Sequence, residues 1–336
     1  MIDEDVFLDK YELYEDLCER RWGSRRNGRP PRPGAPKMDG QVRAALTDEM
    51  GDLEFGFHPT YRPSRFEQGW LLSSLSSFYD EGLITDVLSL VKGGKEAHVY
   101  VCRGAEAAGG QAPLLAAKVY RPRMFRNLRN DKMYREGREI MTAEGKAAGK
   151  AAGTIARAIR NKTEYGMEAS HVSWLSHEYA ALQRLYAAGA AVPRPLASNE
   201  NAVLMGYCGD ERMAAPTLHS VRLDRRQAEA LFREVLRNVD LMLQHDLIHG
   251  DLSAYNILYW QGQITLIDFP QVVNVHTNQH ARRILERDLA RTCEYFALHG
   301  VRCDAQALTA ELWGRYVAAT AAEDVLADWS RIDTDQ

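Results

Sequence analysis

The chain has 336 residues, of which 45% are hydrophobic and 26% are charged, and its formal net charge is −4. This length and composition suit one bilobal core or two small cores, and the net charge excludes binding of polyanions by the protein surface as a whole. No apolar run is long enough to span a bilayer, and the acidic start differs from a signal peptide, so we expect a cytoplasmic protein without a membrane partner.

The first part of the chain reverses its charge along its length. Eight acidic residues lie between Met1 and Glu19, and seven Lys and Arg residues follow among Gly and Pro between Arg20 and Lys37. A segment of this composition does not bury enough apolar surface to form a core. We therefore predict a charged, extended tail over residues 1–64. Two roles stay open for its arginine-rich part, an RNA-binding arm and a solvated tail.

Apolar residues recur from about Arg65 to Leu90, many of them three or four positions apart. This spacing is typical of helices, which we expect to lead into an N-terminal lobe. No recognition-helix pattern of a winged helix stands out in this segment. The residues that carry the pattern are Phe66, Trp70, Leu71, Leu75, Phe78, Leu83, Ile84, Val87 and Leu90.

The segment from Val91 to Val101 has the pattern of a strand, a glycine turn and a second strand. Gly93 and Gly94 permit positive φ angles and let backbone N–H groups approach a phosphate without obstruction by a Cβ atom. No Gly-Lys-Ser/Thr opens a helix here, so the segment is not a Walker motif. By itself, the segment also fits an ordinary hairpin. The residues that would contact a nucleotide are Lys92, Gly93, Gly94, Lys95, Glu96, Ala97 and Val99.

Lys118 stands in the middle of an apolar run, Leu114–Tyr120, that predicts a strand. A lysine in a buried strand needs an anionic partner because an unpaired buried charge is costly. The helical pattern from His171 to Ala187 offers Glu178 as that partner. This ion pair would orient Lys118 toward the α- and β-phosphates of a nucleotide. The alternative is an edge strand from which Lys118 reaches solvent while Glu178 is solvated.

The connection between these two elements, residues 121–165, is long for a compact lobe and strongly basic. It holds twelve Lys and Arg residues against five Asp and Glu residues. Contact with RNA, a ribosomal particle or nucleotide phosphates is one interpretation. A solvated basic loop is the other, and the sequence does not decide between them.

The run Asn201–Gly209 has the pattern of a strand followed by the hinge that joins two lobes. We expect Met205 to lie against an adenine base. The backbone from Gly206 onward would then lie near the edge of the base, with Tyr207 and Cys208 among the contacts. A plain core strand explains the same pattern.

The stretch from His249 to Asn256 contains an acid and an amide at the spacing that phosphoryl transfer requires, and Asp268 follows on a second apolar run. Transfer of a γ-phosphoryl group needs a carboxylate to orient the attacking hydroxyl and oxygen ligands to hold Mg²⁺ against the phosphates. Asp251 suits the first role, and Asn256 with Asp268 suits the second. Two short strands around Gly262 would carry Asp268 back beside the loop. The alternative is that Asp251 caps a turn and Asp268 ends a strand.

The cysteines are odd in number and widely spaced, and no two of them form a Cys-x-x-Cys pair. We therefore expect reduced thiols and no zinc site made of cysteines. His276 and His280 have the i, i+4 spacing of metal ligands on a helix, but without a third ligand we interpret them as polar loop residues. The cysteines are Cys18, Cys102, Cys208, Cys293 and Cys303.

Four of these segments together resemble the RIO family of atypical protein kinases. They are Lys92–Tyr100, Ala117–Tyr120, His249–Asn256 and Ile267–Val273, and the resemblance extends from about Leu71 to about Phe296. It implies an α+β fold, a trimmed bilobal protein kinase with ATP in the cleft. The implied domains are a β-rich N-lobe over residues 65–204, with the basic insert at 121–165, and a mainly helical C-lobe over residues 205–336.

The same resemblance implies roles for individual residues. Asp251 would be the catalytic aspartate, and Asn256 and Asp268 would be the ligands of Mg²⁺ or Mn²⁺. Lys118 and Glu178 would form the ion pair at the phosphates. In the RIO family the metal-binding aspartate can itself accept phosphate, which implies an aspartyl-phosphate at Asp268. The expected function is that of a RIO-type serine/threonine protein kinase or ATPase that acts on a protein substrate or on itself.

Two other functions compete with this one. A small-molecule phosphotransferase of the aminoglycoside or choline kinase type also uses His-Gly-Asp and a later Ile-Asp. The continuation Ile267–Gln271 and the loop Gly93–Glu96 argue against it. The other is a nucleotide-dependent binding factor for ribosomal particles or RNA, which residues 121–165 and the arginine-rich tail would serve.

Overall fold

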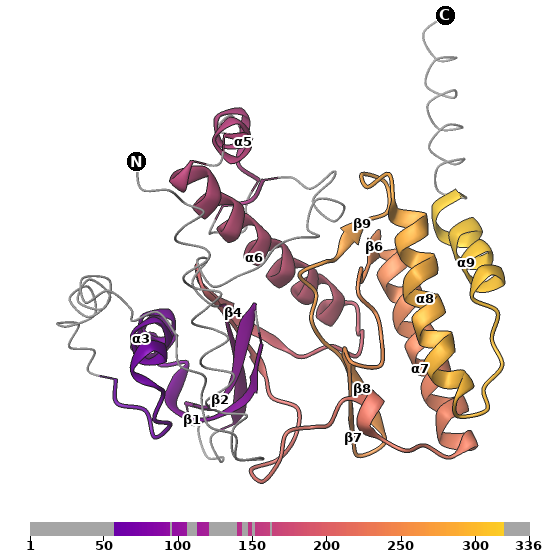
Figure 1. Ribbon diagram of the computed structural model, residues 1–336, viewed down its shortest axis with the longest axis horizontal. Coiled ribbons are helices and arrows are strands. Elements are labelled where there is room, and N and C mark those ends of the chain that lie inside the picture. The colour runs from indigo at the N-terminus through magenta and orange to yellow at the C-terminus, as the bar shows by residue number, and fades with distance from the viewer. Residues whose placement is uncertain are drawn as a thin grey trace, which may run out of the picture.

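The computed structural model places most of the chain from Phe57 onward in two lobes (Figure 1). The first lobe is built on a five-stranded sheet, and the second is mainly helical. This is the bilobal α+β architecture that the sequence predicts. The described residues are 57–94, 96–105, 113–120, 140–142, 147–149, 152–161 and 163–318.

The sheet of the N-lobe has the strand order β1-β2-β3-β5-β4, and each neighbouring pair is antiparallel. Its strands are β1 (Ile84–Gly93), β2 (Ala97–Gly104), β3 (Leu114–Tyr120), β4 (Pro195–Ser198) and β5 (Ala202–Gly206). The strand, glycine turn and strand predicted from Val91 to Val101 are confirmed. β3 lies in the centre of the sheet, so the alternative of Lys118 on an edge strand is excluded.

One helix, α3 (Arg65–Asp80), forms where helices were expected as far as Leu90. The later part of that prediction was wrong, because Gly82 turns the chain with φ 70° and β1 follows. Ile84, Val87 and Leu90 are three residues apart, as in a helix. β1 contains a register shift within each of these intervals, and each shift inserts a residue into the strand. The shifts explain how residues three apart come to face one side of a strand.

Residues that precede α3 also pack on the N-lobe. Phe57 is buried and stacks on Tyr79 of α3, with 4.4 Å between the ring centroids. The backbone N–H of Tyr61 donates to the carbonyl of Val87 on β1. The end of the predicted tail therefore belongs to the lobe, and residues 1–56 lie outside the described residues.

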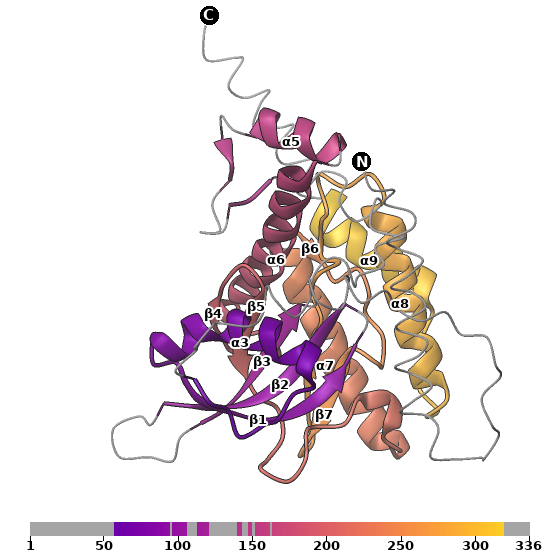
Figure 2. The ribbon, with the colours of Figure 1, turned by 60° about the vertical axis from the view of Figure 1, so that its left-hand side comes forward.

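α6 (Glu164–Ala187) runs between the sheet and the second lobe (Figures 1 and 2). It contains the predicted helix and begins earlier, after the cap Thr163. α5 (Ala152–Arg160) packs against its first turn so closely that a Cβ atom on Gly166 would lie 2.1 Å from the carbonyl carbon of Ala158. Most of the basic connection, residues 121–165, lies outside the described residues.

The C-lobe surrounds a second apolar core that includes buried faces of its two long helices. β7 and β8 form the predicted hairpin, and Gly262 in its turn has φ 84°. The elements are η3 (Leu218–Ser220), α7 (Arg225–Gln244), β6 (Leu247–Ile248), β7 (Ile257–Trp260), β8 (Gln263–Leu266), β9 (Val273–Asn274), α8 (Ala281–Ala297), α9 (Ala305–Trp313) and η4 (Gly314–Ala318).

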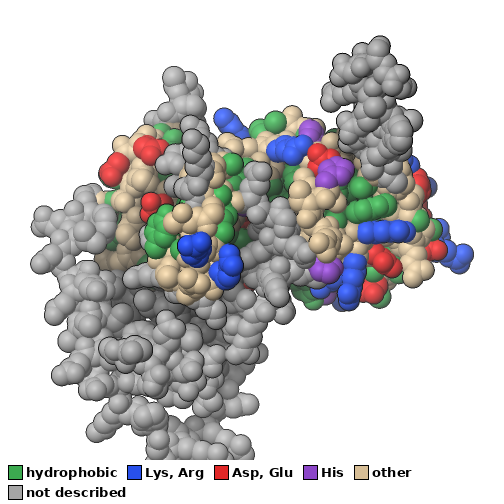
Figure 3. Space-filling view, turned by 90° about the horizontal axis from the view of Figure 1, so that it is seen from above, with side chains coloured by type: hydrophobic (Ala, Val, Ile, Leu, Met, Phe, Trp, Pro, Cys, Tyr) green, Lys and Arg blue, Asp and Glu red, His purple; other side chains and the backbone are tan. Residues whose placement is uncertain are grey.

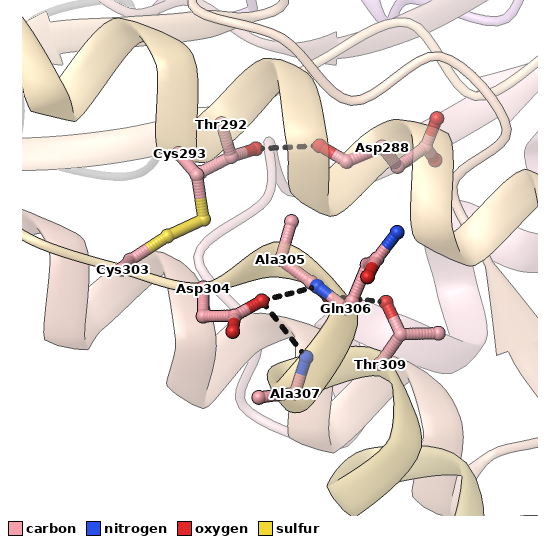
Figure 4. The surroundings of a disulfide bond; sticks show 9 residues. All are labelled: Asp288, Thr292, Cys293, Cys303, Asp304, Ala305, Gln306, Ala307 and Thr309. Carbon is pink, nitrogen blue, oxygen red and sulfur yellow. Dashed lines mark hydrogen bonds between the residues drawn. A yellow bond between two sulfur atoms is a disulfide. The ribbon is translucent and has the colours of Figure 1, made fainter.

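The expectation of reduced thiols was wrong for one pair of cysteines. Cys293 on α8 and Cys303 before α9 form a disulfide, with 5.8 Å between their Cα atoms (Figure 4). Gly300, at φ 82°, helps to reverse the chain after α8 and brings the two thiols together. Spacing alone gave no sign of this pairing because it depends on that reversal. Cys102 and Cys208 are free, and Cys18 lies outside the described residues.

On the face drawn in Figure 3, acidic and basic side chains of the described residues are interspersed rather than gathered into one patch of either sign. Within the described part of the chain, no helix is both long enough and apolar enough to cross a membrane.

Candidate active site

Lys118 on β3 joins three elements of the structure. Its Nζ atom lies 2.6 Å from Oε1 of Glu178 on α6 and 2.7 Å from Oδ1 of Asp268 in the segment after β8. Burial alone would lower the pKa of Lys118, but the carboxylates of Asp268 and Glu178 outweigh this effect and raise it. The ammonium group is therefore charged, and it connects the sheet, α6 and the C-lobe.

Glu178 is buried and has a polar partner on each carboxylate oxygen. Lys118 donates to Oε1, and the hydroxyl of Tyr120 donates to Oε2. Burial raises the pKa of Glu178, and the Lys118 ammonium opposes that rise. The pairing of Lys118 with Glu178 that the sequence predicted is present, whereas the contribution of Tyr120 was not predicted.

Asp268 follows β8 with a left-handed backbone conformation, φ 73°. Aspartate tolerates this region better than most residues, and the conformation turns the chain where the side chain meets Lys118. Burial would raise the pKa of Asp268, but Lys118 above all, with a contribution from Lys92, lowers it below its ordinary value. Lys92 of the glycine turn is therefore close enough to act on Asp268 electrostatically.

The loop from His249 to Asn256 brings the predicted acid and amide into contact. The side-chain nitrogen of Asn256 donates to the carbonyl oxygen of Asp251 over 2.9 Å and to its Oδ2 over 3.0 Å. The carbonyl of Asn256 in turn accepts from the backbone of Ile267, the neighbour of Asp268. The hairpin thus places Asp268 beside the loop, as the sequence predicted.

Two residues give the loop its backbone path. Gly250 has φ 86°, and a Cβ atom there would lie 2.1 Å from the carbonyl oxygen of Gln271, so glycine is required. The buried ring of His249 donates from Nε2 to the carbonyl of Ile267 and accepts at Nδ1 from the backbone of Asp251. One neutral tautomer serves both bonds, and burial lowers the pKa of His249, which favours that neutral form.

Three polar residues of α8 hold the same loop, and the sequence analysis did not identify them. Asp288 accepts from the backbone N–H of Gly250 over 2.8 Å, and Arg287 donates to the Gly250 carbonyl. Arg291 donates to Oδ1 of Asp251 over 2.6 Å. The sequence did hold a sign of the role of Asp288, because it is an acid on the buried face of an amphipathic helix and an acid there needs a polar partner.

The glycine turn and the hinge were predicted to hold the nucleotide. The backbone N–H of Gly94 donates to the carbonyl of Ala97 over 3.0 Å, and Ala97 packs against the C-lobe core. Val99 pairs with Lys118 across β2 and β3. Glu96 is half-buried, the turn residues Lys92 and Gly93 are exposed, and Lys95 lies outside the described residues.

The hinge residues lie at the junction of the lobes. Met205 is half-buried near the end of β5, and the backbone of Tyr207 donates to Leu114 on β3. Cys208 Sγ lies 3.7 Å from the hydroxyl of Thr265 on β8. The hinge therefore contacts the strand that leads to Asp268, and Thr265 is a further residue that the sequence analysis missed.

The histidine pair is separate from this cluster. His276 and His280 lie in the turns between β9 and α8, and His276 Nε2 is 2.9 Å from Oδ1 of Asp246. Among the described residues, no group of three or more His, Cys, Asp and Glu side chains is arranged to hold a metal ion.

Comparison with known proteins identifies the family to which this chain is related. The sequence model of the RIO domain matches residues 99–308. The chain is 32% identical over 218 residues to the RIO-type serine/threonine-protein kinase Rio1 of Haloferax volcanii, covering 64% of this chain and 64% of that protein. It is 30% identical over 221 residues to the serine/threonine-protein kinase RIO1 of Homo sapiens, covering 66% of this chain and 35% of that protein. The chain thus spans less than two thirds of each relative.

Among solved structures, the Rio2 kinase-ADP/Mg2+-phosphoaspartate complex from Chaetomium thermophilum aligns with 92% of this chain and 86% of that chain, with a TM-score of 0.48 and 18% identity. The RIO domain match covers more than half of the chain and contains Lys118, Glu178, Asp251, Asn256 and Asp268. The chain belongs to the RIO family.

Proposed function

We propose that this protein is a RIO-type serine/threonine protein kinase or ATPase that transfers the γ-phosphoryl group of ATP. The observation that carries the proposal is the position of Lys118, which bridges Glu178 and Asp268 beside the loop that holds Asp251 and Asn256. A cation between two acids at the junction of two lobes suits the phosphates of a nucleotide, which would compete with the acids for Lys118.

The N-lobe and hinge would bind the nucleotide. The backbone at Gly93 and Gly94 can approach phosphates because neither residue carries a Cβ atom, and Lys92 would add a positive charge from the same turn. Met205 would lie against the adenine base, and the backbone near Tyr207 and Cys208 would contact its edge. Lys118 would then move from Asp268 to the α- and β-phosphates while Glu178 continues to hold it.

The residues present fit a divalent cation of the hard, oxygen-binding type. Asn256 contacts Asp251 through its amide nitrogen, so its amide oxygen is the atom that would serve as a ligand. The Asp268 side chain is 43% exposed and would supply a carboxylate oxygen. One acid and one amide, completed by phosphate oxygens, suit Mg²⁺, and Mn²⁺ takes similar ligands. The cation would neutralise the charge that develops on the phosphates.

Asp251 would orient the attacking hydroxyl. Its Oδ1 atom accepts from Arg291 and its Oδ2 atom from Asn256, so the carboxylate plane is fixed from two sides. Each oxygen keeps a second lone pair for the hydroxyl proton of the acceptor. That acceptor would be a serine or threonine of a protein substrate or of this chain, and Asp268 would be the acceptor in an ATPase cycle through an aspartyl-phosphate.

The test is incubation of the purified chain with γ-labelled ATP and Mg²⁺. We expect label on the wild-type chain, little label on Asp251→Ala, and full label on the control Glu294→Gln, which alters an exposed acid of α8. Label that is labile to hydroxylamine and absent from Asp268→Asn would identify Asp268 as the acceptor. Label stable to hydroxylamine would indicate serine or threonine. Intact ATP and no label would overturn the proposal in favour of a small-molecule substrate or a binding role.

Contact of residues 121–165 with RNA or a ribosomal particle stays a separate proposal, based on the basic charge of that segment. We expect its deletion to weaken co-sedimentation with RNA at low salt, and the remaining affinity to depend less steeply on salt. Unchanged binding in both respects would exclude the segment as a contact.

A further inference from the structure

Tyr120 lies where β3 and α6 meet, and it is almost completely buried. Residues two apart on a strand face the same side of a sheet, so Tyr120 and Lys118 both point toward α6. Tyr120 donates its hydroxyl proton to Oε2 of Glu178, the oxygen that Lys118 does not contact. The two side chains of β3 therefore hold both oxygens of one carboxylate.

The ring of Tyr120 makes a second attachment to the same helix. It packs edge-on against Trp174, with 4.9 Å between ring centroids, and against His171, with 6.1 Å. His171, Trp174 and Glu178 are three and four residues apart, so they form one stripe along α6. Tyr120 thus contacts α6 over two consecutive turns.

These contacts limit the movement of α6 more than an ion pair alone does. By itself the Lys118–Glu178 pair restrains α6 at one point only, because a long lysine side chain can follow a small rotation or shift of the helix. A carboxylate bound at both oxygens has a fixed plane, and an aromatic ring set against Trp174 fixes the position along the axis. The Lys118 ammonium also lies 5.2 Å from the centre of the Tyr120 ring, so the three side chains form one unit.

We propose that Tyr120 is a positioning residue that locks α6 against β3 and thereby keeps Glu178 on Lys118. Without its hydroxyl, Glu178 loses one of its donors on a buried carboxylate, and Lys118 and the backbone of Phe269 alone would hold it. Lys118 would then stay paired with Asp268, whose Oδ1 atom lies 2.7 Å from the lysine Nζ atom. Asp268 would be less available to bind the metal ion. The consequence for catalysis rests on the proposed function, whereas the lock itself does not.

The test uses Tyr120→Phe, which keeps the ring and removes only the hydroxyl. The matched control is Tyr295→Phe, which removes a buried hydroxyl of α8 that donates to the Leu218 carbonyl and does not contact α6 in the structure. Hydrogen exchange of the backbone amides of α6 is measured in the protein without nucleotide. We expect faster exchange around Glu178 in Tyr120→Phe and wild-type exchange there in the control. Wild-type exchange in both variants would overturn the lock.

Kinetics then show whether the hydroxyl acts through Glu178. We expect Tyr120→Phe to lower kcat/KM for ATP about tenfold, the effect of losing a hydrogen bond to a charged group. In a Glu178→Gln background the same change should cost less than about twofold, because the pair is already broken. An equal loss in both backgrounds would indicate a merely structural role and would overturn the proposal.

A wild-type protein that does not turn over ATP, combined with faster α6 exchange in Tyr120→Phe, would reject the proposed function and retain the lock. If Tyr120→Phe does not fold, Trp174→Leu removes the ring contact and keeps the hydroxyl. It should also speed α6 exchange, and wild-type exchange in that variant would overturn the proposal.

Discussion

The guanidinium of Arg291 donates a 2.6 Å hydrogen bond to Oδ1 of Asp251. Both side chains are partly exposed, at 42% and 36%, so the pair contributes little to folding. Because the pair includes the proposed catalytic acid, we infer that Arg291 orients the Asp251 carboxylate.

We expect Arg291→Ala to lower kcat about tenfold, because Asp251 loses one of the two partners that fix its plane. The free energy of unfolding should change by less than about 1 kcal/mol. Steady-state ATP turnover and urea unfolding measure the two quantities. The control is Arg283→Ala, which removes an exposed arginine elsewhere on α8. Unchanged kcat in Arg291→Ala would show that Asn256 orients Asp251 without help.

Asp288 should contribute far more to stability than Arg291. It is 2% exposed, accepts from Gly250 N and lies 3.1 Å from Arg287. Asp288→Ala leaves the buried N–H of Gly250 without its acceptor and removes the carboxylate beside Arg287, so the free energy of unfolding should fall by about 2–4 kcal/mol. Urea unfolding beside Glu294→Ala, an exposed acid of α8, provides the comparison. Equal midpoints for the two variants would contradict the anchoring role.

Because of Glu67 on α3, the free energy of unfolding should depend on pH in the acid range. Burial would raise the pKa of Glu67, but hydrogen bonds from His98, Tyr100, the Ser64 backbone and Tyr61 outweigh burial and lower it below 4.5. A carboxyl group with a lowered pKa in the folded state stabilises the fold above its unfolded pKa. This contribution is lost as the pH falls through the folded value.

The measurement is urea unfolding of wild type and Glu67→Gln at pH values from above to below the ordinary pKa of 4.5. We expect the difference in unfolding free energy between them to be largest above that pH and to shrink below it. A difference that is independent of pH would mean that the charge of Glu67 contributes nothing and that only its shape matters.

The disulfide between Cys293 and Cys303 should stabilise the C-lobe under oxidising conditions. It closes a short loop with a sequence separation of 10. The chain-entropy argument for such a loop gives a loss of about 2–3 kcal/mol for Cys303→Ser. Urea unfolding with and without a thiol reductant tests this, since the reductant should lower wild type to the level of the variant. Wild type that does not respond to reductant would show that the two thiols are not linked.

Some of the site could be predicted because short-range sequence patterns determine it. The Gly93–Gly94 turn and the hairpin around Gly262 each depend on residues close together in the chain, and the structure contains both. Lys118 and Glu178 are 60 positions apart in the chain, yet their pairing was predictable from the cost of an unpaired buried charge. The catalytic and metal-binding roles assigned to these residues stay predictions.

Other features could not be predicted because they depend on distant elements. Register shifts in β1 gave a strand the spacing of a helix, so the end of α3 was misjudged. Cys293 and Cys303 meet only because the chain reverses after α8. Tyr120 contacts Glu178 only because β3 lies beside α6, and no local pattern distinguishes its hydroxyl from that of any core tyrosine.

The sequence by itself determined which acids, amide and cation would come together, since an apolar run interrupted by one charge demands a partner and the spacing in a loop limits its geometry. Only the tertiary structure decided what holds those groups in place. Arg287, Asp288 and Arg291 reach the loop from α8, and Tyr120 reaches α6 from β3. The physical reason is that hydrogen bonds act over about 3 Å in space, whatever the distance along the chain, and packing of the two lobes alone sets which polar groups come that close.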